Sequence, residues 1–466
     1  MANFVVTTDY ALRQVPPPAL PSAQPSYSQA YQDQFNNVLR LYFNRLNSLL
    51  GQLMATGSSS SGILISFPPT ALDAFGRQRV SEPYSLFDSQ NRYAADNQFS
   101  TYTSGTGSST YNANQASMSL TVTSGGVGQV IRQTFRRFPY QPGKGLLVLA
   151  TFVMSGSTAS SLYQRVGYFD SQNGVFFQRR TGINSFVLRS YISGSVSDAR
   201  KVDQSDWNGD KLDGTGASGL TLDVTKAQIL WMDFEWLGVG SVRCGFIING
   251  QYIVCHTFNN ANDISTVYMT TAILPVRYEI DNTTIPVAAT LTQICSSVIS
   301  EGGFEQTSID HVARRTTEFL NIDTTATFFP IVSIRLASTA LGAVVLPNRV
   351  QFLPLTNQNY EIALLKNPTL TGATWAATVP SDANVEYDVA ATAITDVGTI
   401  VQTDYITSSG SAGISNTSAP TGYNWDLQIG ASLAGASDVY TLAVRTVSGA
   451  TKGSGVGSIS FYDLTQ

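Results

Sequence analysis

Two carboxylates lie two residues apart in an apolar stretch near the middle of the chain. The stretch is WMDFEWLGVG, residues 231–240, and the carboxylates are Asp233 and Glu235. Alternate side chains of a β-strand point to the same face of a sheet, so a strand here would present both carboxylates together. Retaining glycoside hydrolysis needs two carboxyl groups about 5 Å apart, one to attack the sugar and one to protonate the leaving oxygen. The stretch is therefore the first candidate for an active site.

The same stretch resembles the strand EIDFEFLG of the retaining glycoside hydrolases that have a jelly-roll fold. In those enzymes the first Glu is the nucleophile, the last Glu is the acid/base, and an Asp lies between them. By position, Asp233 matches the middle Asp, Glu235 the acid/base and Gly238 the glycine. Trp231 stands where the nucleophile should be. The double displacement cannot proceed on this strand without that first carboxylate.

We therefore expect a sandwich strand here rather than a catalytic site. In that interpretation Asp233 and Glu235 are hydrogen-bonded on one face, and Met232, Phe234 and Trp236 pack on the other. The sequence thus predicts no enzymatic activity, no catalytic residue and no cofactor.

Other residues that commonly do chemistry are sparse. The only two histidines, His256 and His311, have no Cys or second His at ligand spacing, so zinc is not expected. Serine nucleophile elbows and phosphate-binding loops are absent from the sequence. The basic pairs Arg136–Arg137 and Arg179–Arg180 are short and scattered, which favours solvated strand ends.

An acidic loop, DQSDWNGDKLDGTG, is a candidate calcium site. Its four aspartates are Asp203, Asp206, Asp210 and Asp213. It departs from the EF-hand pattern, because Lys211 stands where glycine is needed and Ala217 where the bidentate Glu should be. A polar surface loop is the default interpretation, and calcium binding is the alternative. Trp207 is expected to be exposed beside this loop, where its ring would be able to stack on a sugar.

The segment CGFIINGQYIVC, from Cys244 to Cys255, predicts a β-hairpin about Asn249-Gly250, the strongest short-range hairpin signal. A two-residue turn places Cys244 opposite Cys255 as a hydrogen-bonded pair, with Cα atoms roughly 5.5 Å apart. We expect two packed, reduced thiols there, with a cross-strand disulfide as the alternative. The third cysteine, Cys295, completes neither a disulfide framework nor a metal motif.

Composition favours an all-β protein with many turns. Charged residues make up 13% of the 466 residues, about half the usual share, and 21 Tyr and 23 Phe are present. A net charge of −5 does not suggest nucleic-acid binding. The start, MANFVVTTDY, lacks the features of a signal peptide, and the longest apolar run is too short to span a bilayer. We expect synthesis in a cytoplasm and no membrane insertion.

Residues 1–60 are predicted to form an anchoring segment. A proline-rich arm covers residues 1–25 and a helix covers residues 26–54, where Ser26 and Gln29 have capping-box spacing. Apolar residues then recur at steps of four and three, namely Phe35, Leu39, Tyr42, Leu46, Leu49 and Leu53. This a/d pattern favours self-association, most simply a short parallel trimeric coiled coil or bundle. Docking on another protein or domain is the alternative.

Two β-domains are predicted after the helix. Residues 61–305 show strands separated by Gly, Asn and Ser turns, which predicts a concanavalin-like jelly-roll sandwich with two consecutive hairpins within residues 227–258. Residues 306–466 predict a second, smaller β-sandwich of seven or eight strands. The fold class is thus all-β, preceded by an extended arm and an amphipathic helix.

One further segment, FPPTALDAFGRQRVSEPYSLFDSQNRY, residues 67–93, resembles a recurrent segment in virion structural proteins of tailed bacteriophages, especially phages of marine bacteria and cyanobacteria. The similarity extends to DFEWLGVGSVRCGFIINGQYI and to YEIALLKNPTLTGATW…ANVEYDVAATAI. The stretch YQDQFNNVLRLYFNRLNSLL looks like the anchoring segment of such proteins. The resemblance implies a virion component and carries no catalytic motif.

Together these features predict a homotrimeric tail fibre-like or host-recognition appendage. Residues 1–60 would attach it to other tail or capsid proteins, and the carboxy-terminal domain would touch the host surface, where a glycan is the expected ligand. A capsid decoration or head-fibre protein is the alternative. A polysaccharide depolymerase is less favoured, because Trp231 replaces the nucleophile.

Overall fold

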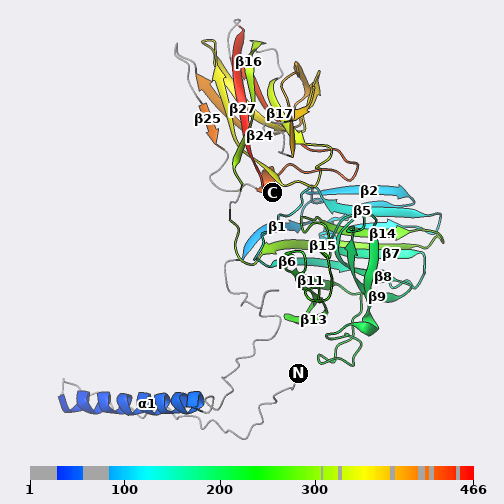
Figure 1. The fold of residues 1–466 in the computed structure, drawn as a ribbon, viewed down its shortest axis with the longest axis vertical. Helices are drawn as coiled ribbons and strands as arrows, with labels where there is room; N and C mark the ends of the chain where they lie inside the picture. Colours follow the sequence, from blue (N-terminus) through cyan, green and yellow to red (C-terminus); the bar gives the residue numbers. More distant parts are fainter. Residues whose placement is uncertain are drawn as a thin grey trace. The chain divides into compact units, whose positions relative to one another are not determined.

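The computed structural model describes residues 29–55, 83–305, 308–323, 328–377, 384–407, 415–418, 425–447 and 452–465, without the side chains of 45–55 and 415–418. The chain divides into two compact units, Met1–Pro68 and Pro69–Gln466. Helix α1 belongs to the first unit and all the strands belong to the second (Figure 1). The predicted proline-rich arm lies outside the described residues.

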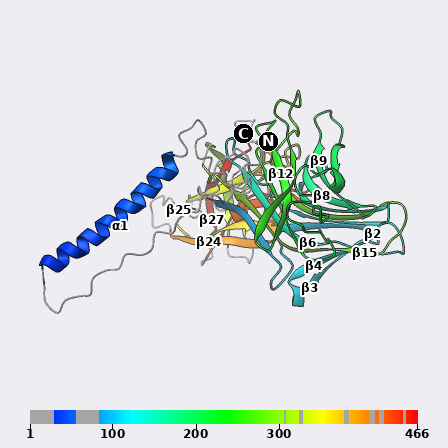
Figure 2. The same ribbon diagram turned by 90° about the horizontal axis from the view of Figure 1, so that it is seen from below.

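Helix α1, Gln29–Ala55, is a single continuous helix of 27 residues (Figure 2). The predicted helix over residues 26–54 is confirmed, with its described bounds at Gln29 and Ala55. The predicted cap at Ser26 lies outside the described residues. The segment contains no proline, and short-range side-chain bonds such as Arg40 Nη2 to Asn37 Oδ1 (2.8 Å) support its polar face. No described helix is long and apolar enough to cross a membrane.

The first sandwich consists of two antiparallel sheets. One has the order β13-β12-β11-β6-β15-β4-β3, with β1 also pairing β15. Its strands are β1 (Tyr84–Gln90), β3 (Ser108–Asn112), β4 (Ser117–Val122), β6 (Leu146–Val153), β11 (Gln228–Phe234), β12 (Val242–Ile248), β13 (Gln251–Phe258) and β15 (Ala289–Ser300). The placement of β6 between β11 and β15 is a long-range crossover, as the jelly-roll prediction requires.

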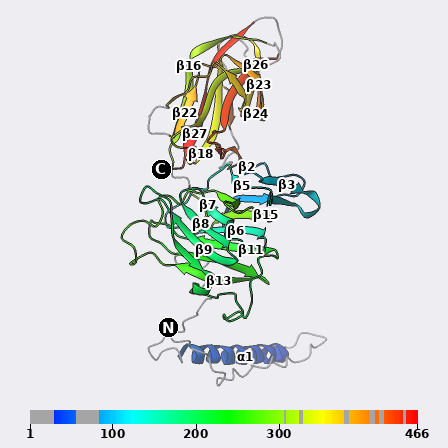
Figure 3. The ribbon, with the colours of Figure 1, turned by 90° about the vertical axis from the view of Figure 1, so that its right-hand side faces the viewer.

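The other sheet has the order β10-β9-β8-β7-β14-β5-β2. Its strands are β2 (Phe99–Gly105), β5 (Gly128–Thr134), β7 (Leu162–Phe169), β8 (Gly174–Arg180), β9 (Ile183–Ser190), β10 (Ser197–Asp203) and β14 (Val276–Asn282). Strands β9, β8, β7, β5 and β2 of this sheet are labelled in Figure 3. Apolar side chains from the two inner faces interdigitate. Phe152 of the first sheet, for example, packs on Phe177 of the second with ring centroids 5.8 Å apart. The predicted concanavalin-like sandwich is confirmed.

Strands β11, β12 and β13 form the two predicted consecutive hairpins. At the second turn Asn249 and Gly250 have φ of 53° and 77°, the left-handed conformations that a type I′ turn requires. The predicted pairing of Cys244 with Cys255 is wrong, because a β-bulge shifts the register and Cys244 pairs with His256. In a regular strand, residues three positions apart point to opposite faces. The extra residue at the bulge lets both Cys255 and Phe258 point into the core. All three cysteines are free thiols.

The second sandwich packs a four-stranded sheet, β16-β27-β18-β25, against a six-stranded one, β21-β22-β17-β26-β19-β24. The four-stranded sheet contains β16 (Asp310–Ile322), β18 (Val345–Pro354), β25 (Ser415–Ser418) and β27 (Gly453–Asp463). The six-stranded sheet contains β17 (Phe329–Leu336), β19 (Asn359–Lys366), β21 (Ala376–Ala377), β22 (Val385–Asp388), β24 (Thr399–Thr407) and β26 (Val439–Thr446). A two-stranded sheet pairs β20 (Thr369–Thr371) with β23 (Ala393–Asp396).

The described part of this sandwich thus has more strands than the seven or eight that the pattern predicts. The excess consists of strands of two to four residues, β20 to β23 and β25. Segments this short carry no readable alternation of apolar and polar residues. The second fold prediction, a smaller β-sandwich, is confirmed, and the domain boundaries at residues 60 and 305 stay predictions.

Candidate functional site

Strand β11 places the two candidate carboxylates in different environments. Asp233 is fully buried, lies opposite Arg243 in the ladder and forms an ion pair with it. Glu235 lies beyond the end of the strand, in the turn to β12, where Oε1 accepts a hydrogen bond from the Ser241 amide (3.0 Å). Both carboxylates are therefore hydrogen-bonded, as predicted, and each has a partner within the hairpin that contains it.

The remaining side chains of the stretch pack. Met232 and Phe234 belong to the main core, as predicted, and Trp236 is half-buried against it. Trp231 is fully buried, and its Nε1 donates to the Ile253 carbonyl (3.2 Å). A Cβ at Gly245 would come within 2.8 Å of that indole nitrogen. A tightly packed indole thus occupies the position that corresponds to the hydrolase nucleophile.

Two carboxylates of the acidic loop accept hydrogen bonds from residues of the same loop. Asp210 accepts from the amides of Leu212 (2.9 Å) and Ser218 (2.6 Å). Hydrogen bonds from the side chain and amide of Thr215 lower the pKa of Asp213. Within the described ranges, no three His, Cys, Asp or Glu side chains gather in a group suited to a metal ion. The structure thus shows local turn bonding for these groups.

Trp207 is not the exposed ring that the sequence predicted. Only 2% of its surface is accessible, its ring packs on Phe186 with centroids 4.7 Å apart, and Nε1 donates to the Val202 carbonyl (3.3 Å). A 3-10 turn, Gln204–Asp206, precedes it and directs the ring into the core. The ring is therefore inaccessible for stacking on a sugar.

The two histidines also have structural partners. His256 is buried, and its Nδ1 accepts a hydrogen bond from the Asn208 amide (3.3 Å). Burial, followed by the positive charge of Arg200, lowers the pKa of His256 to about 4. The side chain is thus a neutral acceptor at physiological pH. His311 stacks on Phe461 with ring centroids 5.6 Å apart.

Helix α1 carries the predicted oligomerisation stripe. Phe35, Leu39 and Tyr42 are half-buried on one side of the helix. Leu46, Leu49 and Leu53 continue along α1, but their side chains lie outside the described set. Not one of the described side chains of α1 is buried. The role of the stripe in self-association stays a prediction.

The two sandwiches meet around Arg136, a residue whose sequence context predicts a solvated strand end. That prediction is wrong: Arg136 is 7% exposed. Its Nη1 donates to the Trp425 carbonyl (2.5 Å), and its Nη2 donates to the Gln98 side chain. Beside it, Gln428 Nε2 donates to the Arg137 carbonyl (2.7 Å). The guanidinium is buried because it satisfies acceptors from both sandwiches.

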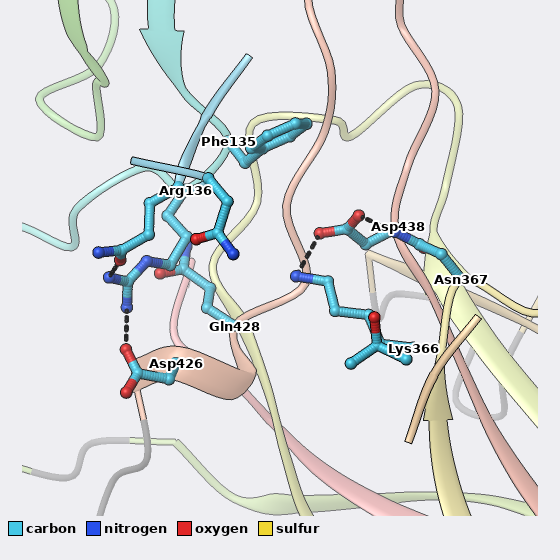
Figure 4. A pocket seen from close by; sticks show the side chains of 10 residues that line it. Phe135, Arg136, Lys366, Asn367, Asp426, Gln428 and Asp438 are labelled. Atoms are coloured by element: carbon cyan, nitrogen blue, oxygen red, sulfur yellow. Dashed lines mark hydrogen bonds and ion pairs between the residues drawn. The ribbon is translucent and has the colours of Figure 1, made fainter. Parts of the chain in front are cut away.

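A polar cavity of about 520 Å³ lies at this junction (Figure 4). Two ion pairs lie in its wall, Arg136 with Asp426 at 3.6 Å and Lys366 with Asp438 at 3.1 Å. Asn367 Nδ2 also donates to Asp438 (2.7 Å). The Arg136–Asp426 pair links the two sandwiches, whereas the Lys366–Asp438 pair lies within the second sandwich. No sequence signal links Arg136 to Asp426, since 290 positions of chain separate them.

Comparisons with known proteins assign no family. No protein-family model matches the sequence, and no curated protein matches it. The sequence-based resemblance to phage virion proteins therefore stays a prediction.

Several solved structures are similar to about half of this chain. The carbohydrate recognition domain of Emp47p has a TM-score of 0.30 and 10% identity, over 47% of this chain and 98% of that one. A carbohydrate esterase from the Shiga toxin-encoding bacteriophage phi24B has a TM-score of 0.29 and 10% identity, over 47% and 99%. Arcelin-5, a lectin-like defence protein from Phaseolus vulgaris, has a TM-score of 0.29 and 10% identity, over 47% and 98%. Similarities this low assign no function.

Proposed function

We propose that this chain is a non-enzymatic structural protein of a tailed-bacteriophage virion. In this proposal it forms a homotrimeric host-recognition appendage, held to other tail or capsid proteins through residues 1–60. The observation that carries the proposal is the apolar stripe of α1, none of whose described members is buried.

An apolar stripe that a helix leaves only partly covered is a candidate contact surface. An isolated helix is marginally stable in water, and most helical stability comes from packing an amphipathic face. Full burial of one Leu or Phe side chain contributes roughly 1.5–3 kcal/mol. The alternating steps of four and three from Phe35 to Leu53 suit knobs-into-holes packing against copies of the same helix. Self-association of α1 would bury the whole stripe at once.

The β-sandwiches suit the projecting part of such an appendage. They meet through a buried guanidinium and through core residues of the second sandwich, Val344 and Leu346, that join the core of the first. Three copies on one particle would multiply weak contacts with a repetitive host glycan. Trimerisation and recognition thus lie in separate parts of the chain.

A capsid decoration or head-fibre protein is the second candidate, since the same helix would serve as an anchor on a capsid. A polysaccharide depolymerase is less favoured, because buried Trp231 occupies the nucleophile position and Asp233 is held by Arg243.

Labelling of virus particles tests this proposal. Antibodies against residues 308–465 would be applied to purified particles of the encoding phage and viewed by electron microscopy. Gold-labelled antibody at the tail supports the host-recognition appendage. Label spread over the head supports the capsid decoration or head-fibre protein. Unlabelled particles that also lack the protein by mass spectrometry would contradict a virion role.

A further inference from the structure

A second cavity, of about 460 Å³, opens beside Trp236. Its wall comes from residues 139–144 after β5, residues 270–273 before β14, Phe304 and Glu305 after β15, and Leu464 and Thr465 after β27. This volume falls within the usual range for small-molecule sites, which combine a mostly apolar wall with a few polar groups. We call it the Trp236 cavity.

Two aromatic rings in the wall are held at a fixed angle. Tyr140 and Trp236 are both half-buried, and their planes meet at 83° with centroids 6.3 Å apart. The Tyr140 hydroxyl accepts from the Trp236 amide (3.0 Å), and Trp236 Nε1 donates to the Met269 carbonyl (3.2 Å). Because hydrogen bonds fix both side chains, the rings would lose little freedom when a ligand packs on them.

Three threonine hydroxyls supply donors around these rings. Thr270 accepts from Asn173 Nδ2 (2.8 Å), Thr271 accepts from the Ile273 amide (3.0 Å), and Thr465 accepts from the Val344 amide (2.8 Å). A hydroxyl that accepts a bond keeps its own hydrogen for donation. The cavity wall thus offers three O–H donors whose oxygens are already held in position.

A charged pair supplies the complementary acceptor. Lys144 Nζ lies 3.6 Å from Glu305 Oε1, and the Glu305 side chain is 80% exposed. Gln141 holds the backbone of Glu305 by two bonds, from Nε2 to the carbonyl (2.5 Å) and from the amide to Oε1 (2.9 Å). The cavity therefore presents ammonium donors and carboxylate acceptors without a net charge.

We propose that the Trp236 cavity binds a neutral pyranoside unit of a host surface polysaccharide. A pyranose ring has an apolar face of C–H groups, suited to an aromatic ring, and hydroxyls that both donate and accept. The balanced Lys144–Glu305 pair favours an uncharged ligand over an anion. The inference rests on the proposed host-recognition function. It places a receptor contact beside the first sandwich instead of solely on the carboxy-terminal domain.

Saccharide binding to the full-length protein tests this proposal. Saturation-transfer NMR and titration calorimetry would use the methyl pyranosides of glucose, galactose, mannose, rhamnose and N-acetylglucosamine. Trp236→Leu removes a ring, and Thr270→Phe fills the cavity from an exposed position. Trp375→Leu is the matched control, because Trp375 is a half-exposed indole of the second sandwich outside this cavity. Thermal melts would establish that each variant is folded.

The proposal predicts saturable binding of at least one pyranoside by the wild type and by Trp375→Leu. Binding should weaken by about tenfold or more in folded Trp236→Leu and in Thr270→Phe. Absence of binding by the wild type, or unchanged binding in both cavity variants, would overturn it. A wild-type protein that binds no pyranoside but is found on phage tails would overturn this inference alone and leave the virion role intact.

Discussion

Arg136 of the first sandwich donates a hydrogen bond to the carbonyl oxygen of Trp425 in the second, at 2.5 Å. The guanidinium is buried, and burial lowers its pKa while the nearby charge of Asp426 opposes that change. A buried charge is tolerated only where hydrogen bonds replace water, and here the Trp425 carbonyl and the Gln98 amide oxygen do so. The contact therefore depends on both sandwiches.

Arg136→Met should loosen the junction between the sandwiches. Loss of hydrogen bonds from a charged donor, with an acceptor left buried, should lower the free energy of unfolding by about 2–4 kcal/mol. Asp426→Asn should cost less than about 1 kcal/mol, because the Asp426 side chain is 85% exposed. Chemical denaturation measures both values, and limited proteolysis detects cleavage between the sandwiches. Equal losses in the two variants would contradict the role given to the Trp425 carbonyl.

Asp233→Asn tests whether the candidate carboxylate is structural. The substitution leaves the Arg243 guanidinium buried without its counter-charge, so unfolding should become easier by about 3–5 kcal/mol. Asp206→Asn, at an exposed position of the acidic loop, is the control and should change stability by less than about 0.5 kcal/mol. Denaturant midpoints provide the comparison. A stable Asp233→Asn protein would show that the ion pair does not hold the hairpin.

His256 should make stability depend on pH below neutrality. Its pKa is lowered to about 4 in the folded state, against about 6.5 when unfolded, so the unfolded chain binds more protons between these values. The stabilising contribution is present above pH 6.5 and is lost as the pH falls towards 4, by about 1–3 kcal/mol. Urea unfolding at several pH values measures the slope.

His256→Gln should flatten that slope, because glutamine keeps an acceptor for the Asn208 amide but does not titrate. His311→Gln leaves His256 in place and should retain the pH slope of the unfolding free energy. A slope equal in the wild type and His256→Gln would assign the pH dependence to other groups.

The thiols should react slowly in the folded protein. Cys244 and Cys255 are fully buried, and burial raises the pKa of both, so the reactive thiolate is scarce. Cys295 is only half-buried and should react first with iodoacetamide. Mass spectrometry of timed samples should show one label before the other two, and all three after unfolding. Rapid labelling of Cys255 in native protein would contradict its placement in the core.

Features encoded by neighbouring residues were predictable. The a/d spacing from Phe35 to Leu53 indicates a helix because residues three and four apart share one face. Asn249-Gly250 indicates a hairpin because both positions adopt positive φ. Met232 and Phe234 alternate with Asp233 and Glu235, which indicates a shared apolar face, and both belong to the core.

Features that depend on distant contacts were not predictable. The bulge at Cys255 depends on which side chains the core accommodates. Counting paired positions outward from the turn does not include that effect. Trp207 turns inward to pack on Phe186 of another strand. Arg136 resembles a surface charge in the sequence, because its burial depends on the Trp425 carbonyl of the other sandwich. The cavities likewise combine loops that only the tertiary fold brings together.

Self-association through α1 is the central claim, and mass in solution by light scattering tests it most directly. The samples would be full-length protein, a truncated protein beginning at Gly62, and full-length Leu39→Glu, with Asn37→Glu as the matched control on the exposed face of α1. We expect trimers for the full-length protein and Asn37→Glu, and monomers for the truncated protein and Leu39→Glu. Full-length protein that is monomeric, or a truncated protein that remains trimeric, would contradict the claim.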